Sequence, residues 1–290
     1  MKVTIDPNAG FCFGVERAIR ATEENLDADH MLYSLGTVVH NEKENKRLED
    51  KGLKVIFNDE FINLKQARVL FRAHGEPPSS YKTACRNATK VVDATCPVVK
   101  KLQLKVAKSF QEMQKQGGMV MLYGKKEHPE AIGLMGQTKN KAMMVSSSDE
   151  IKQADLPFKV RLFAQTTMGS KDYEKIQEAV LARLNALHPD KNIDFKSYWT
   201  ICGQVSGREK KIRRFSSEHE LILFVAGKDS SNGSQLFEIS RESNPRSYYI
   251  SKSDEVDRRW FDGVTDVGIT GATSTPAWLL EEVGKTVENI

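Results

Sequence analysis

The 290-residue sequence is poor in cysteine, and the four cysteines that it has follow none of the common short-spacing motifs. Four cysteines are too few for a disulfide framework in a chain of this length, and no C-x-x-C pair is present. We therefore expect reduced thiols in a cytoplasmic compartment, where they are available for metal or redox chemistry.

Long apolar runs are also missing. No run approaches the roughly 20 residues that cross a bilayer, and the N-terminal residues 1–6 lack the apolar stretch of a secretory signal. The net charge of +4 is small and suits an anionic ligand or an acidic redox partner. Lysine and arginine are spread along the chain without interleaved aromatics, which argues against a nucleic-acid partner. We expect no membrane partner either.

Short apolar strands alternate with amphipathic helical stretches along the whole chain, which predicts an α/β fold with mainly parallel sheets. No low-complexity tract or linker separates them. We predict helices at 14–26, 97–116, 171–187 and 206–215, and strands at 31–34, 69–73, 91–94, 119–123, 161–164, 220–226, 247–250 and 267–270.

One cysteine in each third of the chain stands directly before a predicted helix: Cys12, Cys96 and Cys202. A helix N-terminus favours the thiolate, which is the form that binds metal. Each cysteine alone is compatible with a small buried apolar residue, but the threefold recurrence favours a shared site. Three thiolates suit either zinc or an iron–sulfur cluster with one incompletely ligated iron. Cys85 lacks this setting and is interpreted as structural.

Polar side chains follow several predicted strands, where ligands bind in open α/β sheets. Ser230, Ser231 and Asn232 follow one strand, and Thr273 and Ser274 follow another. Such residues can cap helices and form turns, but together they resemble a phosphate cradle.

His40, His74 and His128 each follow or flank a predicted strand and could bind a diphosphate or a metal. Glu130 lies in the same loop as His128, and it is either a proton donor in a closed pocket or an ordinary helix-start residue. The other histidines, His30, His188 and His219, lie in polar sequence and are expected to be solvated.

Nine short motifs occur in order between residue 10 and about residue 278, and together they resemble one enzyme family. They are GFCFGV at 10–15, VVHN at 38–41, AHG at 73–75, DATCP at 93–97, HPE at 128–130, MGQ at 135–137, QTT at 165–167, TIC at 200–202 and SSN at 230–232. The sequence is similar to the 4-hydroxy-3-methylbut-2-enyl diphosphate reductases, which catalyse the last step of the non-mevalonate isoprenoid pathway.

The resemblance implies an iron–sulfur oxidoreductase that removes the hydroxyl of an allylic diphosphate and forms isopentenyl and dimethylallyl diphosphates. By position, Cys12, Cys96 and Cys202 would hold a [4Fe–4S] cluster with one open iron, and Glu130 would supply protons. The substrate would be bound by His40, His74, His128, Thr166, Ser230, Ser231, Asn232 and Ser274. The implied electron donor is a flavodoxin or a ferredoxin with its reductase.

The family fold implies three similar α/β units around a central iron–sulfur cluster, which we place at residues 1–97, 98–198 and 199–290. The sequence departs from the family at 124–127, at 204–209 and at 271–274, where Ser274 is assigned from the neighbouring Pro276. Two other functions fit the residues, namely a zinc-dependent hydrolase that uses the same thiolates and a non-catalytic protein that binds phosphorylated metabolites.

Overall fold

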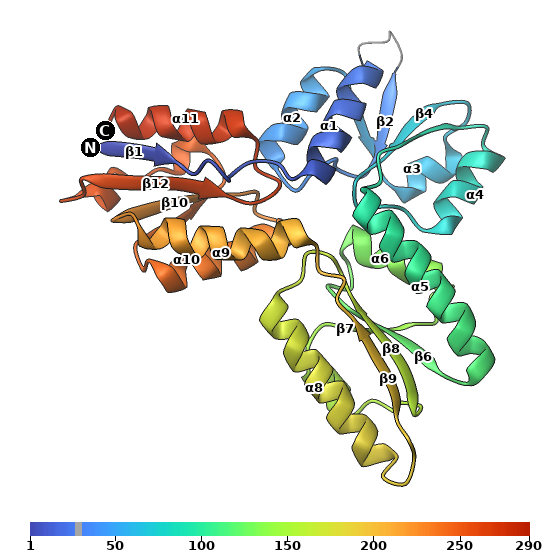
Figure 1. The fold of residues 1–290 in the computed structure, drawn as a ribbon. Coiled ribbons are helices and arrows are strands. Elements are labelled where there is room, and N and C mark those ends of the chain that lie inside the picture. Colours follow the sequence, from blue (N-terminus) through green and yellow to red (C-terminus); the bar gives the residue numbers. More distant parts are fainter. Residues whose placement is uncertain (27–30) are drawn as a thin grey trace. The chain divides into compact units, whose positions relative to one another are not determined.

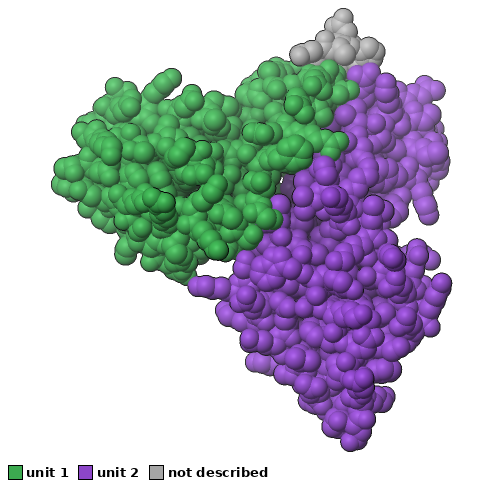
Figure 2. All heavy atoms as spheres, viewed as in Figure 1, with its two compact units in different colours: residues 1–56, 203–290 green, residues 57–202 purple. Residues whose placement is uncertain are grey.

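A computed structural model describes residues 1–26 and 31–290, so that His30 lies outside the described residues. The chain divides into two compact units (Figure 2). Unit 1 comprises Met1–Ile56 and Gly203–Ile290, and unit 2 comprises Phe57–Cys202. The described strands form three four-stranded sheets, and every recorded strand pair is parallel. These findings confirm the predicted α/β class.

Unit 1 contains the sheet β1-β12-β10-β11 (Figure 1), made of β1 (Lys2–Ile5), β12 (Asp266–Gly271), β10 (Leu221–Val225) and β11 (Ser247–Ile250). Its central strand β10 reads Leu-Ile-Leu-Phe-Val and is buried along its whole length, as expected for a strand covered on both faces. Successive side chains of β10 therefore enter two different apolar clusters.

One of these clusters lies under α11 (Ala277–Glu288), where Leu223 and Val225 contact a layer that includes Leu279 and Val283. The opposite cluster lies under α9 (Gly203–Ser217) and α10 (Ser231–Ser243), where Phe224 packs in a layer that includes Ile212 and Leu236. Figure 1 shows α11 on one face of the sheet and α9 and α10 on the other. The N-termini of α9 and α10 are thereby placed at the carboxyl edge of the sheet.

Unit 2 contains the sheet β7-β6-β8-β9, made of β7 (Met143–Val145), β6 (Met119–Tyr123), β8 (Lys159–Ala164) and β9 (Asp194–Tyr198). Alternate residues of β6 again face different layers. Met121 and Tyr123 pack with Tyr173 and other residues of α8 (Ser170–Leu187), whereas Leu122 packs on the α5 (Pro97–Gln116) side.

The remaining elements complete each unit. In unit 1, β2 (Leu32–Leu35) pairs with β3 (Lys54–Ile56), and the helices are α1 (Phe13–Leu26) and α2 (Glu42–Asp50). In unit 2, β4 (Arg68–Phe71) pairs with β5 (Lys90–Asp93). The helices of that unit also include α3 (Asn58–Asn63), α4 (Pro78–Arg86), α6 (Pro129–Gln137) and α7 (Asp149–Lys152). Short 3-10 turns span Ser253–Glu255 and Arg258–Phe261.

The first strand adds a connection that the sequence does not reveal. Strand β1 pairs with β12, so the N-terminal residues belong to the same sheet as the last third of the chain. The three consecutive units that we place at 1–97, 98–198 and 199–290 remain a prediction. No helix in the described part of the chain is both long enough and apolar enough to cross a membrane.

Candidate functional site

All three predicted ligand cysteines stand directly before a helix. Cys12 precedes α1, Cys96 is the N-cap residue of α5, and Cys202 precedes α9. Each is half-buried and forms no disulfide, whereas Cys85 is exposed near the end of α4. A half-buried thiol at a helix N-terminus suits a thiolate ligand, and so the donor set fits an iron–sulfur cluster. The ligand role itself stays a prediction.

Two of these cysteines lie in unit 2, close to the predicted acid. The amide of Cys202 donates to the Thr166 carbonyl at 2.9 Å, and the amide of Cys96 donates to the Ala73 carbonyl at 3.0 Å, next to His74. Thr166 follows β8, and His74 follows β4. The carboxyl ends of the strands therefore carry both the thiols and the candidate catalytic groups.

The predicted acid, Glu130, is buried, with 1 % of its surface exposed. Its two carboxyl oxygens accept hydrogen bonds from Thr166, one from the amide and one from the hydroxyl, each at 2.7 Å. Burial raises the pKa of Glu130 from 4.5 to about 7, although the two hydrogen bonds from Thr166 act in the opposite direction. At neutral pH the group is thus poised between its acid and base forms.

The histidines of unit 2 lie beside this acid. His128 caps α6, and its Nδ1 accepts a hydrogen bond from the Glu130 amide at 3.2 Å. In the neutral ring, the proton is then on Nε2, which remains a donor. The rings of His74 and His128 meet edge to face with their centroids 5.3 Å apart. The structure therefore brings His74, His128, Glu130 and Thr166 together in unit 2, as the resemblance implies.

The remaining predicted residues gather in unit 1, at the ends of β10 and β12. The hydroxyls of Ser230 and Ser274 are 3.2 Å apart, and the Ser274 hydroxyl donates to the His40 carbonyl at 3.3 Å. Ser230 caps α10 by accepting from the Gly233 amide at 3.0 Å. Capping and ligand binding are therefore compatible roles for this serine, since its hydroxyl also faces Ser274.

Asn232 has the strongest indication of a ligand in unit 1. It is 5 % exposed, and its Oδ1 accepts hydrogen bonds from the Thr273 amide at 3.1 Å and the Thr273 hydroxyl at 2.8 Å. Its buried Nδ2 has no hydrogen-bond partner within the described ranges. A buried amide donor held in this way is costly unless it meets an acceptor, such as a phosphate oxygen.

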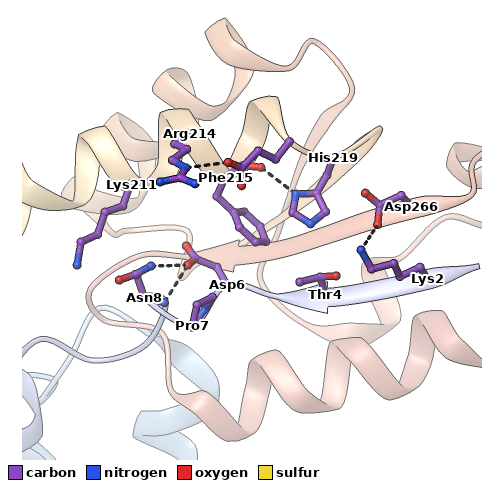
Figure 3. A pocket seen from close by; sticks show the side chains of 11 residues that line it. Lys2, Thr4, Asp6, Pro7, Asn8, Lys211, Arg214, Phe215, His219 and Asp266 are labelled. Carbon is purple, nitrogen blue, oxygen red and sulfur yellow. Dashed lines mark hydrogen bonds and ion pairs between the residues drawn. The ribbon is translucent and has the colours of Figure 1, made fainter.

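A separate pocket of unit 1, with a volume of about 580 Å³, is lined by none of the predicted site residues. Two ion pairs join charged groups of its lining, Lys2 with Asp266 and Arg214 with Glu218 (Figure 3). His219 on this pocket is half-buried rather than solvated as predicted, because its ring packs on Phe215 with centroids 4.2 Å apart. His188 is half-buried too, since its Nε2 is 2.6 Å from the Leu156 carbonyl oxygen.

One charged residue near the candidate ligands is missing from the sequence-based predictions. Arg208 of α9 is buried, and its Nη2 donates to the Gly10 carbonyl at 3.2 Å, two residues before Cys12. In sequence it is one of several basic residues of this helix, and only the helical period distinguishes its buried position from the exposed ones.

Parallel α/β units with a buried acid, and with half-buried thiols at helix starts that fit a metal, are features of an α/β enzyme. The chain belongs to the LytB protein family, whose model matches residues 3–288. It is 42 % identical over 288 residues to a 4-hydroxy-3-methylbut-2-enyl diphosphate reductase of Bacteroides fragilis, covering 99 % of this chain and 98 % of that protein. The corresponding reductase of Chloroherpeton thalassium is 41 % identical over 307 residues, at 99 % and 96 % coverage.

Solved structures agree with this assignment. A (E)-4-hydroxy-3-methyl-but-2-enyl diphosphate reductase, described as the terminal enzyme of the non-mevalonate pathway, is 32 % identical, with a TM-score of 0.71 and full coverage of both chains. A reductase from Plasmodium falciparum, 24 % identical, shares the fold with a TM-score of 0.83 over 99 % of this chain and 87 % of that one. The resemblance and the oxidoreductase class are confirmed.

Proposed function

We propose that the chain reductively dehydroxylates 4-hydroxy-3-methylbut-2-enyl diphosphate to isopentenyl and dimethylallyl diphosphates. The observation that supports this most directly is the buried pair of Glu130 and Thr166. The backbone carbonyl of Thr166 also accepts a hydrogen bond from the Cys202 amide. Thr166 thereby links the proposed proton donor, Glu130, to the candidate cluster ligand Cys202. The reaction replaces a C–O bond by a C–H bond and releases water, which requires two electrons and two protons.

Cys12, Cys96 and Cys202 are proposed to hold a [4Fe–4S] cluster. Held by these three cysteines, such a cluster would supply electrons and Lewis-acid chemistry toward the hydroxyl oxygen. The three thiols fit this group because each is half-buried, outside any disulfide and next to a helix N-terminus.

Glu130 is proposed to donate a proton, through the hydroxyl of Thr166, to the departing oxygen. With a pKa of about 7, a substantial fraction of Glu130 is protonated at neutral pH. The Thr166 hydroxyl both donates to Glu130 and can accept from it, and so it can pass a proton on. Delivery of a further proton to either allylic carbon decides which of the two products forms.

The diphosphate is proposed to bind the hydroxyls of Ser230, Ser231 and Ser274, the Asn232 amide, and the imidazoles of His40, His74 and His128. Nδ2 of Asn232 is the buried donor that lacks a partner in the described chain. Binding the distant diphosphate orients the reacting hydroxyl, which converts binding energy into a lower barrier.

The proposed electron donor, implied by the resemblance to the family, is a flavodoxin or a ferredoxin with its reductase, and the net charge of +4 suits an acidic redox partner. We also propose a cytoplasmic location, since half-buried thiols that form no disulfide persist in a reducing compartment.

The test is anaerobic purification, followed by iron and sulfide analysis, a visible spectrum, and an assay with reduced methyl viologen. We expect about four iron and four sulfide per chain, visible absorption that bleaches on reduction, and oxidation of the viologen only when substrate is added. A colourless zinc protein would instead support the hydrolase. Substrate binding without oxidation of the viologen by the iron-loaded protein would support a binding protein.

A further inference from the structure

Arg208 is a buried cation on the helix that begins directly after Cys202. Arg208 is 7 % exposed, whereas Lys210, Lys211 and Arg213 of the same helix are exposed. Burying a guanidinium is costly unless a negative group or enough acceptors compensate it. The compensation must therefore come from what surrounds Arg208.

The hydrogen bonds of Arg208 compensate only part of that cost. Nη2 donates to the Gly10 carbonyl at 3.2 Å, but the buried Nη1 has no hydrogen-bond partner in residues 1–26 and 31–290. Burial lowers the pKa of the guanidinium, and the negative charges of Asp6 and Cys12 act in the opposite direction. Asp6 and Cys12 are thus the groups near Arg208 that can carry a negative charge.

Asp6 is largely engaged elsewhere. Its Oδ2 accepts from the Thr270 hydroxyl at 2.8 Å, and its Oδ1 accepts from the Asn8 amide at 2.8 Å. Figure 3 shows the contact between Asp6 and Asn8 at the edge of the pocket of unit 1. Cys12, the proposed ligand, is the other group near Arg208, and a negative group bound there would face its charge.

The segment around Cys12 is held at several points. Gly10 has a φ of +109°, a conformation that L side chains rarely adopt. The Cys12 amide donates to the Thr273 carbonyl at 3.0 Å, and its carbonyl accepts from the Glu16 amide at 2.9 Å. The bond from Arg208 to Gly10 adds a tether on the other side of Cys12.

We propose that Arg208 is a positioning residue that fixes the Cys12 segment through the Gly10 carbonyl and stabilises, by its buried charge, the reduced form of the iron–sulfur group bound by Cys12. This inference rests on the proposed function. Reduction adds a negative charge to the group, and a fixed positive charge in a poorly solvated place favours the more negative state. Arg208 thus raises the reduction potential.

Two substitutions separate the charge of Arg208 from its hydrogen bond. Arg208→Gln keeps a hydrogen-bond donor and removes the charge, whereas Arg208→Lys keeps the charge. Arg213→Gln is the matched control, because Arg213 lies on the same helix, is exposed, and pairs with Glu242 at 3.0 Å. All three proteins are loaded with iron anaerobically, and their midpoint potentials are measured by a redox titration followed by electron paramagnetic resonance.

We expect Arg208→Gln to shift the midpoint to a more negative potential, and Arg208→Lys and Arg213→Gln to stay close to the original protein. An unchanged midpoint in Arg208→Gln overturns the proposal. Loss of iron from both Arg208 variants, with the iron content of Arg213→Gln intact, overturns the proposal as well. In that case the positive charge that Arg208→Lys retains would have no effect on the bound group. A role in folding alone would change stability and leave the potential of the loaded protein unmoved.

Hydrogen exchange on the metal-free chain tests the tether without any cluster. We expect Arg208→Met, which has no donor, to accelerate exchange at the Cys12 amide several-fold while Arg213→Met leaves it unchanged. Unaltered exchange in Arg208→Met overturns the tether. If the original protein binds no iron, the proposed function fails and with it the charge effect, whereas the hydrogen-exchange result still decides the tether.

Discussion

Replacing Glu130 by glutamine tests whether the buried carboxyl donates a proton. An exposed glutamate with a pKa of 4.5 would be protonated in about 0.3 % of molecules at pH 7, whereas a pKa of about 7 leaves about half of them protonated. Burial thus raises the concentration of the acid form more than ~100-fold at neutral pH. The glutamine amide could not donate a proton to an oxygen leaving group, but it would keep the shape and an acceptor for Thr166.

We expect Glu130→Gln to lower kcat by about 10² to 10⁴, the usual contribution of a general acid. The iron content and KM should remain close to those of the original protein. Glu127→Gln serves as the control, because Glu127 is exposed in the same loop. Steady-state kinetics with reduced viologen give both constants. A kcat within twofold of the original value would remove Glu130 from the proton path.

The same pKa has a consequence for stability. Because folding raises the pKa of Glu130, the folded state holds its proton more tightly than the unfolded state does. The contribution is fully present below about pH 4.5 and is lost as the pH rises through about 7, at a cost of about 3 kcal/mol. Urea unfolding of metal-free protein should therefore show a weaker loss of stability between pH 5 and pH 8 in Glu130→Gln. Identical pH dependence in both proteins would contradict the raised pKa.

Two further pairs of substitutions test the ligands and the loop at the end of β10. Cys85→Ser should leave the iron content unchanged and Cys96→Ser should lose it, as measured by colorimetric iron analysis after anaerobic loading; the reverse pattern would refute the ligand assignment. Gly227→Ala should destabilise the chain by about 1–3 kcal/mol and raise KM, because the added Cβ would lie too close to the His40 carbonyl oxygen, at 2.3 Å. Gly207→Ala, whose Cβ meets nothing within 4 Å in α9, should instead gain about 0.5–1 kcal/mol in urea unfolding; equal effects of the two alanines would refute the clash.

Elements with a strong local signal were predictable from the sequence. The helix predicted at 97–116 begins and ends where α5 does, because Pro97 suits the first helical position and Gly117 takes the left-handed conformation that ends helices. The predicted strands at 119–123 and 247–250 coincide with β6 and β11. In each case the sequence signal lies within the element and its immediate neighbours, even where the strand pairs with a distant one.

Elements that depend on distant partners were not predictable. Strand β1 has only four residues and no clear alternation of burial, and it is defined by its pairing with β12, at the other end of the chain. Strand β9 is half exposed at the edge of its sheet, so that its sequence DFKSY lacks an apolar pattern. Arg208 was missed for a related reason, since its burial depends on the segment around Gly10.

Thr166 shows why candidate residues alone do not describe a mechanism. Its amide and hydroxyl both serve Glu130, and its carbonyl accepts the amide of Cys202. The position of the proposed ligand and the pKa of the proposed acid are therefore coupled through one residue. A change at Thr166 is expected to alter iron content and turnover together. Glu130→Gln leaves the Thr166 carbonyl in place, and for that reason it separates proton donation from ligand geometry.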